Sequence, residues 1–137
     1  MIVVDTNVWS ELTRQEPNDA VRRWEAANAH LLWMSTIVLA EFRAGVVLMP
    51  EGRRRASLLA QIEAIVNIYS DRILPFDEAV SRLYGQVLLS ARQAGKPIMA
   101  ADAMIAATAL SHDMSVATRN RADFVGAGVS LIDPWAD

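Results

Sequence analysis

The sequence predicts an α/β fold with a mostly parallel central sheet, in a single domain that spans residues 1–137. Short apolar runs typical of buried strands alternate with longer stretches of helical periodicity. Strands that alternate with helices form βαβ units, in which the strands are parallel and the crossovers right-handed. The chain has the length of one domain and contains no internal repeat and no long linker.

Five short apolar runs are predicted as strands: residues 2–4, 31–34, 73–76, 115–118 and 129–132. The stretches with helical periodicity are residues 8–13, 18–28, 35–49, 51–69, 77–94 and 100–111, with a further helical turn before the last strand. The third strand contains Pro75 and is expected at an edge of the sheet, because proline cannot donate to a strand ladder.

Polar residues and prolines set the helix boundaries. The N-caps are expected from the residues before each helix: Thr6 or Asn7, Asn18, Ser35 or Thr36, and Asp77. Pro50 separates two helices that have almost no linker between them, which predicts a helical hairpin. Three tryptophans fall at apolar positions and are expected in the core or an interface: Trp9, Trp24 and Trp33.

The composition excludes several kinds of active site. There is no cysteine, which excludes disulfides, thiolate catalysis and cysteine-based zinc sites, and His30 and His112 are the only histidines. The net charge of −3 argues against a nucleic-acid ligand, but Lys96 is the only lysine among 13 basic residues, and the others are arginines suited to phosphate contacts. An apolar content of 53% is high for this length and favours a surface hidden in an oligomer.

The N-terminal residues do not resemble a signal peptide, so we expect no secretion. No run reaches the roughly 20 apolar residues of a membrane helix, and the apolar stretch 37–47 is cut by Glu41 and Arg43. The absence of disulfides is compatible with the reducing cytoplasm, where we expect the protein to reside.

Asp5 ends the first predicted strand, which places a carboxylate at the carboxyl edge of the sheet. Ligands of open parallel sheets bind at that edge. A cap for the next helix is the structural alternative, but Thr6 and Asn7 could serve for that. A functional and a structural role for Asp5 therefore have about equal weight when it is taken alone.

Glu41 shares a helical stripe with apolar residues: Ile37, Ala44 and Leu48. This spacing predicts an acid in the middle of an apolar face, where an unpaired charge is costly. The alternative is an ion pair or a side chain that reaches the edge of the face. Arg43 points elsewhere on the helix, so we favour a functional role for Glu41.

Asp102 lies in the first turn of an alanine-rich helix. The helix dipole favours a carboxylate there, which is an adequate structural reason. The neighbouring residues are small or apolar and predict burial almost all round, and a buried carboxylate needs a partner. A metal ion would supply one.

Polar residues also follow the fourth strand. Thr118, Asn120 and Asp123 are ordinary turn and capping residues when taken singly. If the first and fourth strands are neighbours, Asn120 or Asp123 falls beside Asp5. The acids Asp5, Glu41, Asp102 and Asp123 then form the oxygen-rich site that Mg²⁺ or Mn²⁺ prefers, and such an ion predicts phosphoryl chemistry with an activated water.

With these positions in view, the chain resembles PIN-domain proteins of the VapC toxin type. The resemblance spans nearly the whole chain, in order, through residues 2–7 (IVVDTN), 35–41 (STIVLAE), 101–109 (ADAMIAATA), 116–124 (VATRNRADF) and 133–135 (DPW). It implies a three-layer α/β/α sandwich and a Mg²⁺- or Mn²⁺-dependent endoribonuclease. It also implies a homodimer, possibly within a larger toxin–antitoxin assembly, and a cognate antitoxin that blocks the active site.

Carried over to this sequence, Asp5 and Asp102 match the family's metal ligands and Glu41 matches its second acid. The fourth acid is Asp123, or else Asn120 fills the position where many relatives carry an acid. The supporting groups are Thr6, Asn7, Thr118 and Asn120. Two arginines, Arg119 and Arg121, are candidates for contacts with the RNA backbone, with solvated surface arginines as the equal alternative. The cluster Arg53, Arg54 and Arg55 fits a solvated helix start or an antitoxin-facing surface better than a catalytic role.

Two other kinds of function compete with this one. A haloacid-dehalogenase-like phosphatase uses a strand-end Asp as nucleophile and an acid two residues later, but Asn7 stands at that second position and Lys96 is poorly placed as its lysine. The missing lysine also weakens a response-receiver interpretation. A PIN-like binding module without cleavage stays open because Asn120 replaces an acid.

Overall fold

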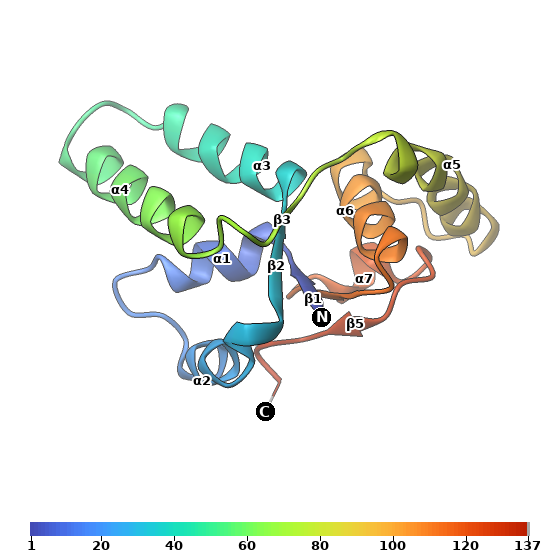
Figure 1. Ribbon diagram of the computed structural model, residues 1–137, viewed down its shortest axis with the longest axis horizontal. Coiled ribbons are helices and arrows are strands. Elements are labelled where there is room, and N and C mark those ends of the chain that lie inside the picture. The colour runs from blue at the N-terminus through green and yellow to red at the C-terminus, as the bar shows by residue number, and fades with distance from the viewer. Residues whose placement is uncertain (137) are drawn as a thin grey trace.

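A five-stranded sheet organises the computed structural model, which describes residues 1–136. The strand order is β3-β2-β1-β4-β5, and every pairing is parallel (Figure 1). The strands are β1 (Ile2–Val4), β2 (Leu32–Ser35), β3 (Ile73–Leu74), β4 (Ser115–Ala117) and β5 (Leu131–Ile132). The predicted α/β fold with a parallel sheet is confirmed, and β3 lies at an edge as Pro75 predicted.

Helices cover both faces of this sheet. They are α1 (Thr6–Leu12), α2 (Asp19–Asn28), α3 (Thr36–Val47), α4 (Arg53–Ile68), α5 (Glu78–Gln93), α6 (Ala100–Ser111) and α7 (Arg121–Phe124), with a 3₁₀ turn at Ala29–Leu31. Right-handed crossovers that run in opposite directions along a sheet cover opposite faces. Accordingly, α1, α3 and α4 lie on one side of the sheet in Figure 1 and α5, α6 and α7 on the other, which is the expected α/β/α sandwich.

The core lies between the central strands and their helices. Val3, Val4 and Val116 are fully buried, as strands covered on both faces require. The face of α6 toward β1 and β4 carries small residues that let this helix lie close to the sheet, among them Ala103 and Ala107. Trp9 is buried, and Trp24 and Trp33 pack against the core, as their apolar positions predicted.

Three of the predicted N-caps are confirmed. Asn18 Oδ1 accepts from Ala20 N at 2.9 Å, Ser35 Oγ accepts from Val38 N at 3.1 Å, and Asp77 Oδ1 accepts from Val80 N at 3.0 Å.

The expected cap of the first helix is wrong, because neither Thr6 nor Asn7 caps it. Asp5 is the N-cap, and α1 begins at Thr6, two residues earlier than predicted. The Asp5 N–H still pairs with Ala117 O at 2.9 Å. The same residue therefore ends β1 and starts α1.

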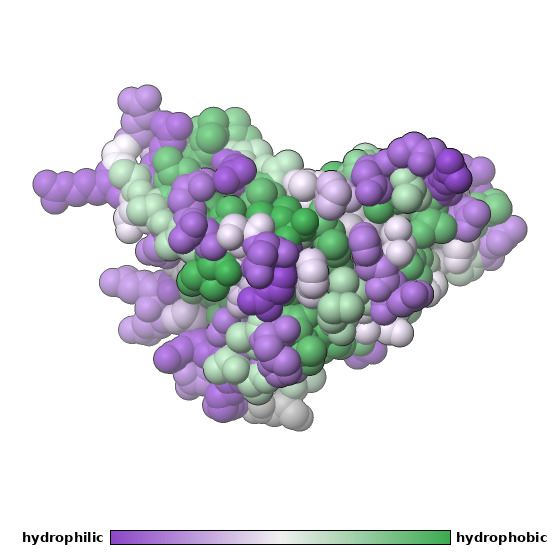
Figure 2. Space-filling model, in the orientation of Figure 1, coloured by the Kyte–Doolittle hydropathy of each residue, from purple (hydrophilic) through white to green (hydrophobic). Residues whose placement is uncertain are grey.

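The predicted hairpin of α3 and α4 is present, and the two helices pack side by side (Figure 1). Apolar side chains gather over these helices on the face shown in Figure 2. Val47, Leu48 and Ile68 are exposed on them. Within residues 1–136, no helix combines the length and apolar character needed to cross a bilayer.

Candidate functional site

The candidate site lies where the strand order reverses direction. β1 sits between β2 and β4, so the segments that leave β1 and β4 turn to opposite faces of the sheet and open a crevice between them. Asp5 directly follows β1, and Thr118 directly follows β4. The two strand ends are neighbours, because Val4 pairs with Ala117, so the condition under which Asn120 or Asp123 falls beside Asp5 is met.

The Asp5 carboxylate is buried, and both of its oxygen atoms accept hydrogen bonds. Thr6 N donates to Oδ1 at 2.7 Å, while Asn7 Nδ2 and Thr118 Oγ1 donate to Oδ2 at 3.0 and 2.8 Å. Burial raises the pKa of Asp5 above its ordinary value, against the effect of these three hydrogen bonds, and the charge of Asp123 adds to the rise. Asp5 therefore caps α1 and also presents a carboxylate in the crevice.

Thr118 joins the polar side chains around Asp5 into one network. Its hydroxyl donates to Asp5 and accepts from Asn7 Nδ2 at 3.2 Å and from Asn120 N at 3.1 Å. The Asn7 side chain also accepts from Arg119 N at 3.1 Å. The network fastens the start of α1 to the segment after β4.

Glu41 is exposed on α3, so the prediction that it lies within an apolar face is wrong. The buried face of α3 is one residue out of phase with the expected stripe and consists of Val38, Phe42 and Val46. The helix is apolar almost all round, which leaves its spacing ambiguous. Glu41 nevertheless turns toward the crevice, where its Oε1 accepts from Thr6 Oγ1 at 2.8 Å.

Asp102 lies in the first turn of α6 and is half-buried, which is less than its neighbours predicted. Burial, followed by the charges of Asp5, Asp123 and Glu41 in that order, raises the pKa of its carboxyl to about 6. No protein donor within residues 1–136 forms a hydrogen bond with its carboxylate. Asp102 therefore lies among like charges without a compensating cation from the described chain.

The structure brings both candidates for the fourth position to the crevice. Asp123 is exposed in α7 and close enough to raise the pKa of Asp5 and of Asp102. Asn120 is anchored through its backbone to Thr118 and lines the cavity above the acids. Asp123 supplies charge at the site, and Asn120 supplies an amide.

The chemistry of these side chains fits a hard divalent cation. Asp5, Glu41, Asp102 and Asp123 offer only carboxylate oxygens, and burial together with repulsion from neighbouring acids raises the pKa of Asp5 and of Asp102. Within residues 1–136, no three acidic or histidine side chains are already arranged as ligands around one point. Asp5 and Glu41 are instead held by neutral donors, which fix their directions at the mouth of the crevice.

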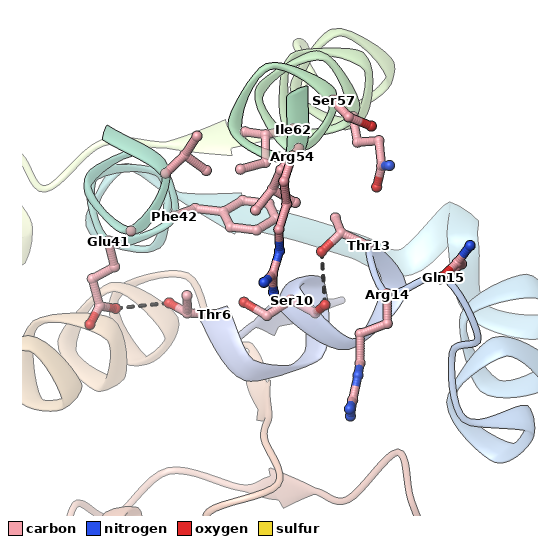
Figure 3. Close-up of a pocket in the computed structure, with 14 residues that line it drawn as sticks. Thr6, Ser10, Thr13, Arg14, Gln15, Glu41, Phe42, Arg54, Ser57 and Ile62 are labelled. Atoms are coloured by element: carbon pink, nitrogen blue, oxygen red, sulfur yellow. Dashed lines mark hydrogen bonds between the residues drawn. The ribbon is translucent and has the colours of Figure 1, made fainter. Parts of the chain in front are cut away.

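Two adjoining cavities open around the acids. The first, which we call the acid cavity, has a volume of about 540 Å³ and lies over Asp5, Glu41 and Asp102. The second, which we call the hairpin groove, has a volume of about 890 Å³ and runs between α1 and the α3–α4 hairpin (Figure 3). The two share four lining residues: Thr6, Ser10, Arg14 and Glu41.

Sequence reasoning missed a buried acid on α1. Glu11 is only 7% exposed and lines the acid cavity together with Arg14. Its Oε1 accepts from Asn18 N at 2.8 Å and its Oε2 from Arg14 Nη1 at 3.2 Å. The spacing of three residues between the acid and the arginine was the one available signal.

The two arginines that are candidates for RNA contacts differ in their surroundings. The Arg119 guanidinium lies 5.2 Å from the ring centre of Trp135, so this side chain is held by a cation–π contact. Arg121 begins α7 and is exposed. Arg119 lies on the segment between β4 and α7, next to Asn120, which lines the acid cavity.

Several known proteins resemble this chain over its whole length. The plasmid stability protein StbB of Pseudomonas syringae pv. tomato is 44% identical and covers 98% of this chain and 99% of its own. The VapC ribonuclease Y4jK of Sinorhizobium fredii is 43% identical, with 98% of both chains covered. The toxin FitB of Neisseria gonorrhoeae is 42% identical over all of both chains.

The fold agrees with this likeness. A structure of FitAB bound to an IR36 DNA fragment superposes with a TM-score of 0.94 at 42% identity, over 100% of this chain and 97% of that one. FitAcB from Neisseria gonorrhoeae gives a TM-score of 0.93 at 41% identity over all of both chains. The family model described as the PIN domain matches residues 2–126. The chain thus belongs to the PIN domain family, as the order of its motifs predicted.

Proposed function

We propose that this protein is a Mg²⁺- or Mn²⁺-dependent endoribonuclease and the toxin of a type II toxin–antitoxin pair. The observation that carries the proposal is the convergence of four acids from separate segments on the switch point of the sheet: Asp5, Glu41, Asp102 and Asp123. Without a cation this cluster would repel a phosphodiester. The family and the names of the relatives, a VapC ribonuclease and a toxin, support the same activity.

Asp5 and Asp102 would hold the metal ion, directly or through waters, and Glu41 and Asp123 would complete its surroundings or orient the attacking water. When bound, the ion neutralises the phosphate and makes a bound water more acidic for in-line attack. The Thr6 hydroxyl donates to Glu41, and the Thr6 N–H donates to Asp5. Thr6 therefore orients both carboxylates toward the crevice.

The hydrogen bonds around Asp5 favour a ligand over a nucleophile. Both of its oxygens are held by donors, and Asn7 is one of them. Asn7 cannot act as the general acid that a phosphatase of the haloacid-dehalogenase type needs. This observation gives the phosphatase no support.

For partners, we propose RNA as substrate, a cognate antitoxin and a homodimer, all acting in the cytoplasm. The solved relatives FitAB and FitAcB support the antitoxin. The exposed apolar residues Val47, Leu48 and Ile68 on the hairpin support a protein interface. Light scattering of the purified protein tests the dimer, and co-purification with the product of an adjacent small reading frame tests the antitoxin.

The activity is tested by cleavage of a panel of structured RNAs with Mg²⁺, Mn²⁺ or EDTA. We expect cleavage by the wild type with either metal, and a loss of at least about 100-fold in Asp5→Asn and Asp102→Asn. Asp113→Asn is the matched control, since Asp113 is exposed away from the site and has a φ of 55°, which asparagine tolerates. Equal cleavage by the wild type and Asp5→Asn would overturn the mechanism.

A further inference from the structure

Arg14 occupies a position that the mechanism above does not use. It follows the end of α1 and lines both the acid cavity and the hairpin groove. Its side chain is 66% exposed, whereas that of its partner Glu11 is 8% exposed. A cation therefore stands at the junction of the two cavities.

Glu11 fixes the place of this cation. One carboxylate oxygen accepts from the backbone of Asn18 and the other from Arg14, so the loop after α1 folds back over the acid. Burial opposes the charge on Glu11, but the Asn18 hydrogen bond and the nearby charges of Arg14 and Arg119 lower its pKa below the ordinary value. The carboxylate stays ionised and engages one end of the guanidinium, which leaves other N–H donors of Arg14 available to a ligand.

A second arginine lies on the opposite wall of the groove. Arg54 extends from the first turn of α4 toward Ser10 of α1 (Figure 3). Arg43 and Arg55 pair with Glu63 and Glu51, whereas Arg54 has no ion pair or hydrogen bond among residues 1–136. Arg54 and Arg14 are thus the two cations of this groove.

The charge balance of the site indicates that Arg14 and Arg54 bind an anion. A divalent cation neutralises only half of the charge of the four acids at the crevice, so the phosphates on either side of a scissile phosphate are still repelled. Arginine at the exit from the crevice offsets that repulsion and binds phosphate with good geometry. The groove also carries hydroxyl and amide side chains that suit a sugar–phosphate backbone: Ser10, Thr13, Ser57 and Gln61.

We propose that the hairpin groove carries the RNA strand away from the acids, and that Arg14 and Arg54 bind backbone phosphates next to the scissile one. Glu11 is a positioning residue that acts through Arg14. This inference rests on the proposed ribonuclease function and extends it to residues that no motif of the family resemblance contains.

The test measures binding of a fluorescent single-stranded RNA of mixed sequence in the Asp102→Asn background, where the proposed function predicts no cleavage. We expect Arg14→Ala and Arg54→Ala each to weaken binding about tenfold. Each should also reduce the slope of log affinity against log salt by about one, as the loss of one phosphate contact requires. In the active protein, Arg14→Ala should raise KM and leave kcat nearly unchanged.

Arg22→Ala is the matched control. Arg22 pairs with Asp19 at the same spacing of three residues and is 64% exposed, but lies at neither cavity. Glu11→Gln keeps an acceptor for Asn18 and removes the charge, so it should weaken RNA binding at an unchanged melting temperature. A melting temperature that falls while RNA affinity stays constant would give Glu11 a merely structural role.

The outcomes separate this inference from the proposed function. If the wild type cleaves RNA but the arginine variants keep their RNA affinity and salt slope, the inference alone is overturned. The hairpin groove would then be a site for a protein segment. If the wild type never cleaves RNA, the proposed function is overturned. The binding measurement still tests whether Arg14 and Arg54 bind RNA phosphates. If RNA binds neither the parent protein nor any of the variants, both the proposed function and this inference are overturned.

Discussion

The side chains of Thr118 and Asp5 are joined by a hydrogen bond of 2.8 Å across 113 residues of the chain. The hydroxyl that donates this bond also accepts from Asn7 and from the backbone of Asn120. One buried hydroxyl thus orients the carboxylate at the end of β1 and ties the segment after β4 to α1.

Replacement of Thr118 by valine removes that hydroxyl at nearly constant volume. We expect Thr118→Val to lower the free energy of unfolding by about 1–3 kcal/mol, because the buried Asp5 carboxylate loses a donor and Asn7 loses an acceptor. Divalent metal affinity should fall about 10- to 100-fold, as is typical when a group that orients a ligand is lost. Denaturant unfolding and calorimetric titration with Mn²⁺ measure the two effects.

Thr108→Val provides the comparison, since Thr108 is also fully buried but donates within α6, to Met104 O at 2.7 Å. It should leave metal affinity unchanged. Equal metal affinity in Thr118→Val and the wild type would show that the Asp5 carboxylate needs no support from Thr118.

Asp102 gives the metal-free protein a defined pH dependence. Its pKa is about 6 in the folded protein against an ordinary 3.8, so the folded state binds more protons than the unfolded state between these values. This group therefore makes stability fall as pH rises from about 4 to 6, and the deficit persists above 6. Asp102→Asn should raise the melting temperature in EDTA at pH 7.5 and have little effect on it at pH 3.5.

Divalent metal supplies the control for that prediction. Mg²⁺ or Mn²⁺ should raise the melting temperature of the wild type at pH 7.5 and raise that of Asp102→Asn less. A variant that melts at or below the wild-type temperature in EDTA at pH 7.5 would contradict the repulsion among Asp5, Glu41, Asp102 and Asp123.

The ionisation of Tyr69 should destabilise the protein at alkaline pH. The phenol is 4% exposed, donates to Glu25 at 3.2 Å and packs edge-on against Trp9 at 5.0 Å. Burial, followed by the charge of Glu25, raises the pKa of Tyr69 to about 12. The folded state keeps its proton longer than the unfolded state, so stability should fall as pH rises from 10 to 12. Absorbance titration should show this phenol ionising last, and Tyr69→Phe should remove that step at a loss of about 1 kcal/mol at pH 7.

Gly126 is required by close packing. A Cβ at this position would lie 2.9 Å from Ala91 Cα and 3.3 Å from Lys96 O, and backbone atoms of α5 and the following turn cannot give way easily. Gly126→Ala should therefore destabilise the protein by about 1–3 kcal/mol. Gly85→Ala, within α5 and with nothing in reach of its Cβ, should stabilise it by up to about 1 kcal/mol. Denaturant unfolding of both variants measures the contrast, and a neutral Gly126→Ala would disprove the packing argument.

The strands and the helices followed from the sequence because apolar periodicity and caps such as Asn18 and Asp77 act locally. The pairing of β1 with β4 is a contact between distant segments, and the sequence offered it only as a condition. The cap of α1 did not follow. Asp5, Thr6 and Asn7 are all good capping residues, and the choice depends on where the hydrogen bonds of β1 to β4 end.

The sequence indicated which acids meet at the crevice better than it indicated how buried each of them is. The phase of α3 is ambiguous because nearly every residue around Glu41 is apolar, so spacing placed this acid on the wrong face. Glu11 escaped notice because its burial comes from the return of Asn18 over α1, a contact between a helix and a loop that no periodicity encodes.

The position of β1 at the centre of the sheet has a consequence for the making of the protein. Asp5 leaves the ribosome well before Asp102, Thr118 and Asp123, and β1 lacks one of its two neighbours until β4 has been made. A nascent chain that ends before β4 therefore holds Asp5 without the Thr118 hydroxyl that helps to orient it and without Asp123. Whatever the four carboxylates accomplish together begins only after α7 has been made.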